Sequence, residues 1–129
     1  MAFRDPVDKS LLRMEGRRFA ARCEIQVSSI ERADTLREVS RLTSSIALPF
    51  AIAEDDTARD ALRQVQMRAE DRARELIQEQ IQNLARAEEN QREKQKRAML
   101  EAWGNLTGPL GHLRGWAQSK LVAAEQQNK

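Results

Sequence analysis

The chain has 129 residues, of which 33% are charged and 4% are aromatic, and its formal net charge is +2. So few aromatic residues argue against a compact globular core, although Leu, Ile, Val and Ala suffice for narrow seams between helices. The single cysteine excludes an intrachain disulfide. Ala, Glu, Gln, Arg and Leu dominate the composition, and these strong helix formers predict an all-α fold.

Residues 1–16 predict an irregular start followed by a short helix. Pro6, Asp8 and Ser10 are typical of a helix start, and Gly16 is expected to end the helix that contains Leu11. No apolar run precedes these residues, so no secretory signal is expected. No apolar stretch reaches the about 20 residues of a transmembrane helix. We therefore expect a protein made in the cytoplasm.

Residues 17–48 contain neither Gly nor Pro and predict the first long helix. Phe19, Cys23, Val27 and Ile30 recur at helical spacing. The apolar residues that flank Cys23 predict that it is a small buried residue and not a reactive thiol; they are Ala20, Ala21, Ile25 and Val27. Pro49 ends this helix, because proline lacks a backbone donor and disfavours the helical conformation of the residue before it. Residues 49–57 then form a connector with an apolar tip, whose N-cap candidates are Asp55, Asp56 and Thr57.

Residues 58–103 also lack Gly and Pro and predict a second, longer helix. Its apolar positions follow helical spacing as far as Leu84, whereas alanines are the only apolar residues from 85 to 98. A helical stretch that is polar all round is solvated, held by charge pairs or docked on a partner.

Two long helices joined by a short connector predict an antiparallel hairpin. A turn near residues 52–53 pairs positions whose numbers sum to about 105, so that Leu84 faces Ala21. In this register the second helix overhangs the first from about Glu89, inside the stretch without an apolar seam. We expect a single elongated helical unit, completed by a Gly-rich turn and a short amphipathic helix within residues 104–129.

Trp103 and Trp116 bracket the Gly-rich turn, and large aromatic residues at helix ends are typical interface anchors. The alternative is that they fold back over the turn as a small local core. Contact of the C-terminal helix with a membrane surface is a weaker alternative. The predicted interface residues are Trp103, Leu106, Leu110, Leu113, Trp116 and Leu121.

Two basic clusters give an alternative function in DNA or RNA binding. In the expected hairpin they lie near the same end of the molecule, where interleaved glutamates such as Glu93 weaken the field. The predicted nucleic-acid contacts are Arg17, Arg18, Arg92, Lys94, Lys96 and Arg97.

No motif for catalysis or for a cofactor occurs in the sequence. A phosphate loop, a nucleophile elbow and a dinucleotide fingerprint are all missing, and His112 has no second ligand at a suitable spacing. We expect no catalytic residue, no metal, no cofactor and no small-molecule substrate.

The long helix at 58–103, the Gln-rich stretch at 78–82 and the Gly-rich break before the last helix give the chain a family likeness. Over residues 30–125 it resembles the small internal-core, or ejection, proteins of short-tailed bacteriophages. The resemblance implies a non-enzymatic helical subunit that is packed in many copies on the portal inside the virion and released with the DNA. No functional residue is carried over.

Flagellar and type III export stalk proteins have a similar composition, and a cytoplasmic coiled-coil adaptor or secretion chaperone is a further alternative. The leading expectation is a structural subunit of a multi-copy assembly. Its partners are then copies of itself or other subunits of that assembly.

Overall fold

The computed structural model describes residues 6–127, which form five α-helices and two short 3₁₀ segments, with no β-strand among them. The all-α prediction is therefore confirmed. The irregular start expected at residues 1–5 and the last two residues of the polar tail, 128–129, lie outside the described residues.

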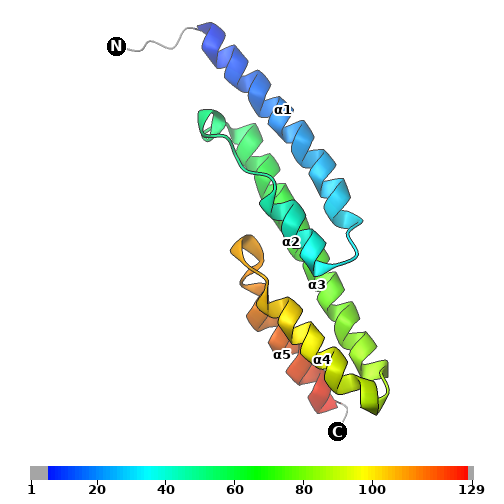
Figure 1. The fold of residues 1–129 in the computed structure, drawn as a ribbon. Helices are drawn as coiled ribbons and strands as arrows, with labels where there is room; N and C mark the ends of the chain where they lie inside the picture. Colours follow the sequence, from blue (N-terminus) through cyan, green and yellow to red (C-terminus); the bar gives the residue numbers. More distant parts are fainter. Residues whose placement is uncertain (1–5, 128–129) are drawn as a thin grey trace.

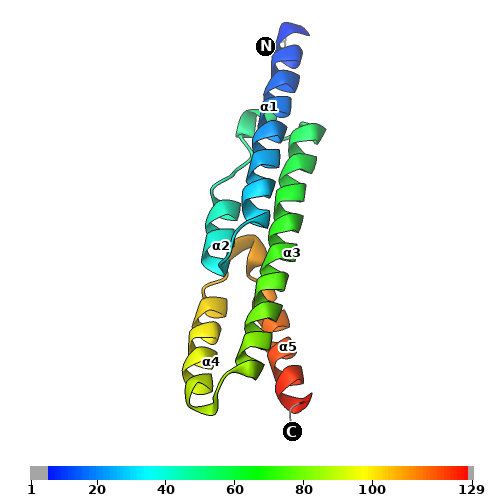
Figure 2. The same cartoon turned by 90° about the vertical axis from the view of Figure 1, so that its right-hand side faces the viewer.

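The helices lie along one long axis, and the third helix extends through both halves of the molecule (Figure 1). α3 (Asp56–Arg86) has 31 residues and is about 46 Å long at 1.5 Å per residue. α1 (Pro6–Glu31) and α2 (Leu36–Ser44) pack beside its first half, and α4 (Glu89–Gly104) and α5 (Leu113–Gln127) beside its second half. The molecule thus consists of two three-helix bundles stacked end to end, and α3 belongs to both (Figure 2).

α1 runs parallel to α3, which corrects the predicted pairing of residues 17–48 with residues 58–103 as one long hairpin (Figure 1). Gly16 lies against Asp55 at the start of α3, and Glu31 pairs with Arg68 farther along it, with 3.8 Å between Oε1 and Nε. An antiparallel turn does join α2 to α3 through the predicted connector. The antiparallel hairpin is therefore limited to the short α2.

The predicted register between Leu84 and Ala21 is also wrong. Leu84 lines a cavity of the second bundle together with Leu121. Ala21 is exposed on α1, and its neighbour Ala20 lines a cavity with Ala61 of the first bundle. The two predicted partners therefore belong to different bundles.

The first long helix predicted at residues 17–48 is two helices, because the chain turns at residues 32–35. The Thr35 hydroxyl accepts a hydrogen bond of 3.1 Å from the backbone N–H of Glu38, which caps α2. Arg72 of α3 donates from Nε to the carbonyl of Ala33 at 2.9 Å, so the turn is also held from outside. α2 ends at Ser44, whereas the predicted helix continued to Leu48, directly before Pro49.

Gly16 lies inside α1 and does not end a separate short helix. A Cβ at this position would overlap the carboxylate of Asp55, so glycine allows the close approach of the two segments. The same carboxylate accepts a hydrogen bond of 2.9 Å from the N–H of Ala58, which confirms Asp55 as an N-cap of α3.

The second long helix predicted at residues 58–103 is likewise interrupted, at Ala87 and Glu88. Both residues have extended backbone, with ψ of 147° and 149°, and the chain reverses direction there without Gly or Pro. α4 then folds back along α3 (Figure 2). The stretch expected to overhang in solvent is therefore part of the second bundle, anchored by the buried Met99 and Trp103.

Candidate protein-interaction surface

The residues predicted to anchor a partner are largely buried inside the chain itself. Trp103 is 1% exposed, and its indole N–H donates to Oε1 of Gln80 on α3 at 2.9 Å. Trp116 is half-buried, with the guanidinium of Arg74 5.7 Å from its ring centroid. These residues therefore belong to the core that is shared with α3, which extends beyond the small local core over the turn that was the alternative. The buried members of the predicted set are Trp103, Leu106, Leu110, Leu113 and Leu121.

The structure separates the two basic clusters that the expected hairpin brought together. Arg17 and Arg18 lie on α1 of the first bundle, whereas Arg92, Lys94, Lys96 and Arg97 lie on α4 of the second. Several of these charges have partners within the chain. Arg18 pairs with Glu15 at 3.0 Å, Lys96 pairs with Glu125 at 3.0 Å, and Arg92 donates to the carbonyl of Ala87 at 3.1 Å. The described residues thus present no single basic face built from both clusters.

No metal-binding cluster is found within residues 6–127. No group of three or more His, Cys, Asp and Glu side chains there could hold a metal ion. His112 is half-exposed and lies 3.0 Å from Oε1 of Glu70. Cys23 is buried, as predicted. Burial raises the pKa of its thiol, and the positive charge of Arg22 opposes that shift.

Large apolar side chains that remain exposed are the strongest sign of an interaction surface in this structure. Three of them lie on α1 and one follows Pro49 in the connector, so four belong to the first bundle before α3 begins. Singly scattered apolar residues are ordinary on protein surfaces, and only a cluster requires an explanation. The exposed large apolar residues are Leu11, Met14, Ile25, Phe50, Met67, Leu100 and Val122.

Leu11, Met14 and Ile25 point to one side of α1, where the exposed Arg18 lies between Met14 and Ile25, and we call these three residues the α1 stripe. At about 100° per residue their directions fall within about 60° of one another. They are 51%, 43% and 68% exposed, while Phe19 and Cys23 on the opposite face are buried. α1 is thus apolar on two faces, and only one of them is covered by the chain.

The N-terminal part of α1 also projects past the first bundle (Figures 1 and 2). Gly16 lies beside Asp55, the N-cap of α3, so residues 6–15 extend beyond the start of α3. These residues correspond to roughly 15 Å of helix at 1.5 Å per residue. Leu11 and Met14 of the α1 stripe therefore lie on a helix segment that α3 does not support.

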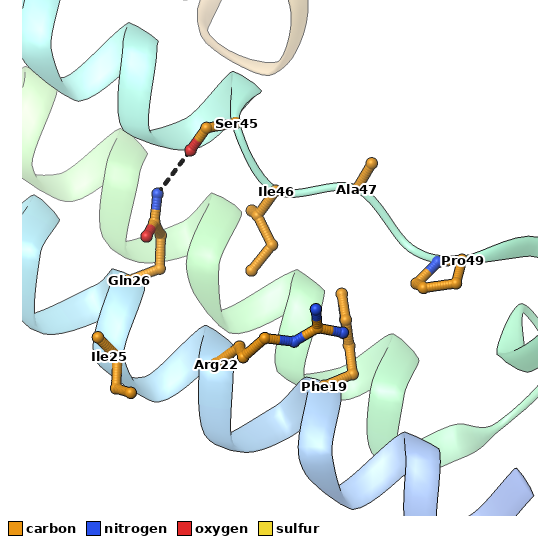
Figure 3. A pocket seen from close by; sticks show the side chains of 8 residues that line it. All are labelled: Phe19, Arg22, Ile25, Gln26, Ser45, Ile46, Ala47 and Pro49. Carbon is orange, nitrogen blue, oxygen red and sulfur yellow. Dashed lines mark hydrogen bonds between the residues drawn. The ribbon is translucent and has the colours of Figure 1, made fainter.

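A groove beside the α1 stripe separates α1 from the segment that leaves α2 (Figure 3). Its volume is about 350 Å³. At one end, the amide of Gln26 donates to the Leu42 carbonyl at 2.6 Å and to the Ser45 hydroxyl at 2.8 Å. We call this the Phe19 groove; it is lined by Phe19, Arg22, Ile25, Gln26, Ser45, Ile46, Ala47 and Pro49.

The Arg22 guanidinium and Phe50 give this region its chemical character. Figure 3 shows the Arg22 side chain extending along the groove toward Phe19, and its guanidinium carbon lies 5.6 Å from the Phe19 ring centroid. Phe50, directly after the groove residue Pro49, is 97% exposed, whereas Ile52 in the same 3₁₀ segment η1 (Phe50–Ile52) is buried. An exposed aromatic residue therefore directly follows a groove that has both apolar and polar lining residues.

The sequence contained a signal for this surface that the spacing analysis did not use. Positions 11, 14, 18 and 25 repeat at intervals of three, four and seven, and three of these four positions are apolar. Together with Phe19, Cys23 and Ile30 they describe a helix with two apolar faces. A predicted helix end at Gly16 places Leu11 and Met14 on a different helix from Ile25, so the second apolar face cannot be recognised.

Comparison of the chain with protein families, curated proteins and solved structures found no match. No helix within residues 6–127 has the length and the apolar composition needed to cross a membrane.

Proposed function

We propose that this chain is a non-enzymatic structural subunit that functions by binding other proteins, its own copies included, within a larger assembly. The observation that carries the proposal is the α1 stripe. Leu11, Met14 and Ile25 are exposed on a helix whose N-terminal part projects beyond the bundle. An apolar helix face of this kind is ordinarily covered by a second helix.

The shape of the molecule supports the same function. The two bundles are joined through the continuous α3, so the subunit is a rod rather than a shell around a binding cavity (Figure 2). Ligand pockets usually enclose most of a bound small molecule. The Phe19 groove is instead an open feature on the outside of the first bundle. A rod with an uncovered apolar end suits assembly better than it suits small-molecule binding.

The experiment is light scattering on the purified chain over a range of concentrations, compared with a variant of the α1 stripe. The variant carries Leu11→Ser, Met14→Ser and Ile25→Ser. We expect the wild-type chain to form oligomers, and the variant to remain monomeric at concentrations at least tenfold higher. The matched control carries Met67→Ser and Val122→Ser, which lie on α3 and α5 and are 50% and 53% exposed. The control should associate like the wild type.

Either of two results would contradict the proposal. One is a wild-type chain that stays monomeric at every concentration. The other is a control variant that loses association as strongly as the α1-stripe variant.

The setting that we propose for this assembly is the interior of a phage virion, supported by the resemblance of residues 30–125 to internal-core proteins. This setting predicts that the chain is present in purified particles in many copies and leaves them with the DNA when ejection is triggered. Quantitative mass spectrometry of particles before and after ejection measures both. Absence of the chain from the particles would leave the assembly function standing and overturn the setting.

A further inference from the structure

We propose that the Phe19 groove binds the Phe50 side chain of a second copy of this chain, while that copy's groove binds Phe50 of the first. The inference rests on the proposed assembly function and names one of its contacts. The Phe50 ring, the knob of this contact, is attached close to the groove, because Pro49 lines the groove and Phe50 follows it directly. A two-fold symmetric contact needs such a self-complementary patch, in which each copy offers both parts.

The exposure of Phe50 and the chemistry of the groove fit each other. A phenyl ring that is 97% exposed can be buried only by another molecule, since the chain leaves it uncovered. The groove of about 350 Å³ has apolar side chains from Ile25 and Ile46 beside the polar Gln26 and Ser45, and the buried Phe19 lies at its base. Arg22 already lies over the Phe19 ring at 5.6 Å, and its planar guanidinium has a second face that an incoming ring can stack on.

Charge favours a second copy over an unrelated apolar partner. The segment after Phe50 carries Glu54 and Asp56, both exposed and acidic. On α1, the exposed Arg22 lines the groove, while Arg18 pairs with Glu15 and the exposed Glu24 follows two residues after Arg22. In the reciprocal pair that we propose, the acidic segment of each copy lies near Arg22 of the other copy's groove. Opposite charges arranged in this way steer association and set its orientation.

The area of the contact indicates which other residues take part. Two buried phenyl rings supply about 300–500 Å². A stable interface buries roughly 1,200–2,000 Å² in total. Leu11 and Met14 of the α1 stripe lie on the same side of α1 as Arg22, so they can supply part of the remainder. Phe50 is then the central anchor, and the α1 stripe surrounds it.

The first test measures dimer dissociation by analytical ultracentrifugation for the wild type and for Phe50→Ala. We expect the dissociation constant to rise at least about thirty-fold, as for the loss of an interface anchor. Arg22→Ala should raise it roughly three- to thirty-fold, because the cation–π contact is lost. Val122→Ala, on α5, is the control and should leave it unchanged. Added salt should weaken the wild-type dimer, since the charged segments then attract each other less.

The second test mixes two variants, each impaired in a different half of the contact. Phe50→Ala removes the knob. Ile25→Glu puts a carboxylate at the mouth of the groove, within reach of Arg22 three residues earlier. When mixed, the intact Phe50 of one variant can still enter the intact groove of the other. Native mass spectrometry should therefore show more mixed dimer than either dimer of identical copies.

The outcomes separate this inference from the function on which it rests. If the wild type associates and Phe50→Ala associates equally well, the contact is overturned and the assembly function stands. A mixed dimer no more abundant than the two others also overturns the reciprocal contact. A wild-type chain that remains monomeric overturns both proposals. Circular dichroism should show unchanged helix content for all three variants, because Phe50, Arg22 and Ile25 are exposed in the folded chain.

Discussion

Trp103 is the largest fully buried side chain described in this structure, and its environment defines its role. It packs in the second bundle and donates its indole hydrogen to Gln80 of α3, so it links α4 to α3. A side chain that is 1% exposed has little surface left for another protein. Trp103 therefore stabilises the fold and is not a docking residue in the folded subunit.

Substitution of Trp103 by Ala should lower the free energy of unfolding by about 3–5 kcal/mol, because it leaves a large cavity in the core. Trp116→Ala should cost distinctly less, since Trp116 is only half-buried. Urea unfolding followed by circular dichroism measures both values. Equal losses for the two variants, or an effect of Trp103→Ala on association without an effect on stability, would contradict this assignment.

At the scale of the element, the short α2 depends on its cap. It has nine residues, too few for an isolated helix to be stable in water. Its N-cap Thr35 satisfies the N–H of Glu38, and its buried face includes Val39 and Leu42. Capping and packing must therefore both hold this helix in place.

Thr35→Ala should lower the free energy of unfolding by about 1 kcal/mol, the usual loss for an N-cap threonine. Thr35→Asp keeps an acceptor at the cap and should cost much less. Chemical denaturation of the three proteins checks the difference. If the Ala and Asp variants are equally stable, the hydrogen bond to Glu38 contributes nothing measurable.

These helix boundaries show what the sequence could predict. Composition correctly predicted the fold class, and the apolar flanks of Cys23 predicted its burial. Asp55 was one of three N-cap candidates, and the structure selects it. The capping pattern from Thr35 to Glu38 could have revealed the start of α2. The reversal at Ala87 has no Gly or Pro, and its only local sign is the end of the apolar seam, which also fits a solvated helix.

The candidate surface was harder to predict than the helices. Exposure of the α1 stripe depends on the parallel packing of α1 on α3, and sequence spacing cannot distinguish parallel from antiparallel packing. The predicted anchors, Trp103 among them, have the composition of an interface, but they are buried by their own chain. Burial within the subunit and burial by a partner require the same residue types.

At the scale of the whole molecule, α3 connects two bundles that also meet where α2 approaches α4 and the 3₁₀ segment η2 (Gly108–Leu110). A cavity at this junction is lined by Leu36, Arg37 and Leu106, among others. The junction is thus not fully packed. Continuity of α3 is therefore the main mechanical connection between the bundles.

Asp71 lies near the middle of α3 and is exposed, which makes it a site for testing this connection. Asp71→Pro should cost about 3 kcal/mol or more and should separate thermal unfolding into two transitions, one for each bundle. Asp71→Ala removes only the 3.8 Å pair with Arg74, so this variant and the wild type should each unfold in one transition. Differential scanning calorimetry distinguishes the cases. A single transition for Asp71→Pro would show that the bundles are coupled by other contacts.

The parallel course of α1, α3 and α5 has a mechanical consequence. α1 begins at one end of the rod and α5 ends at the other (Figure 1). A pulling force applied to the two ends of the chain therefore acts along the helix axes. Under this force the helices slide past one another, so the side-chain contacts between two packed helices must break together and not one pair at a time. We expect such a subunit to resist a force along its length better than a force that pulls one helix sideways from its bundle.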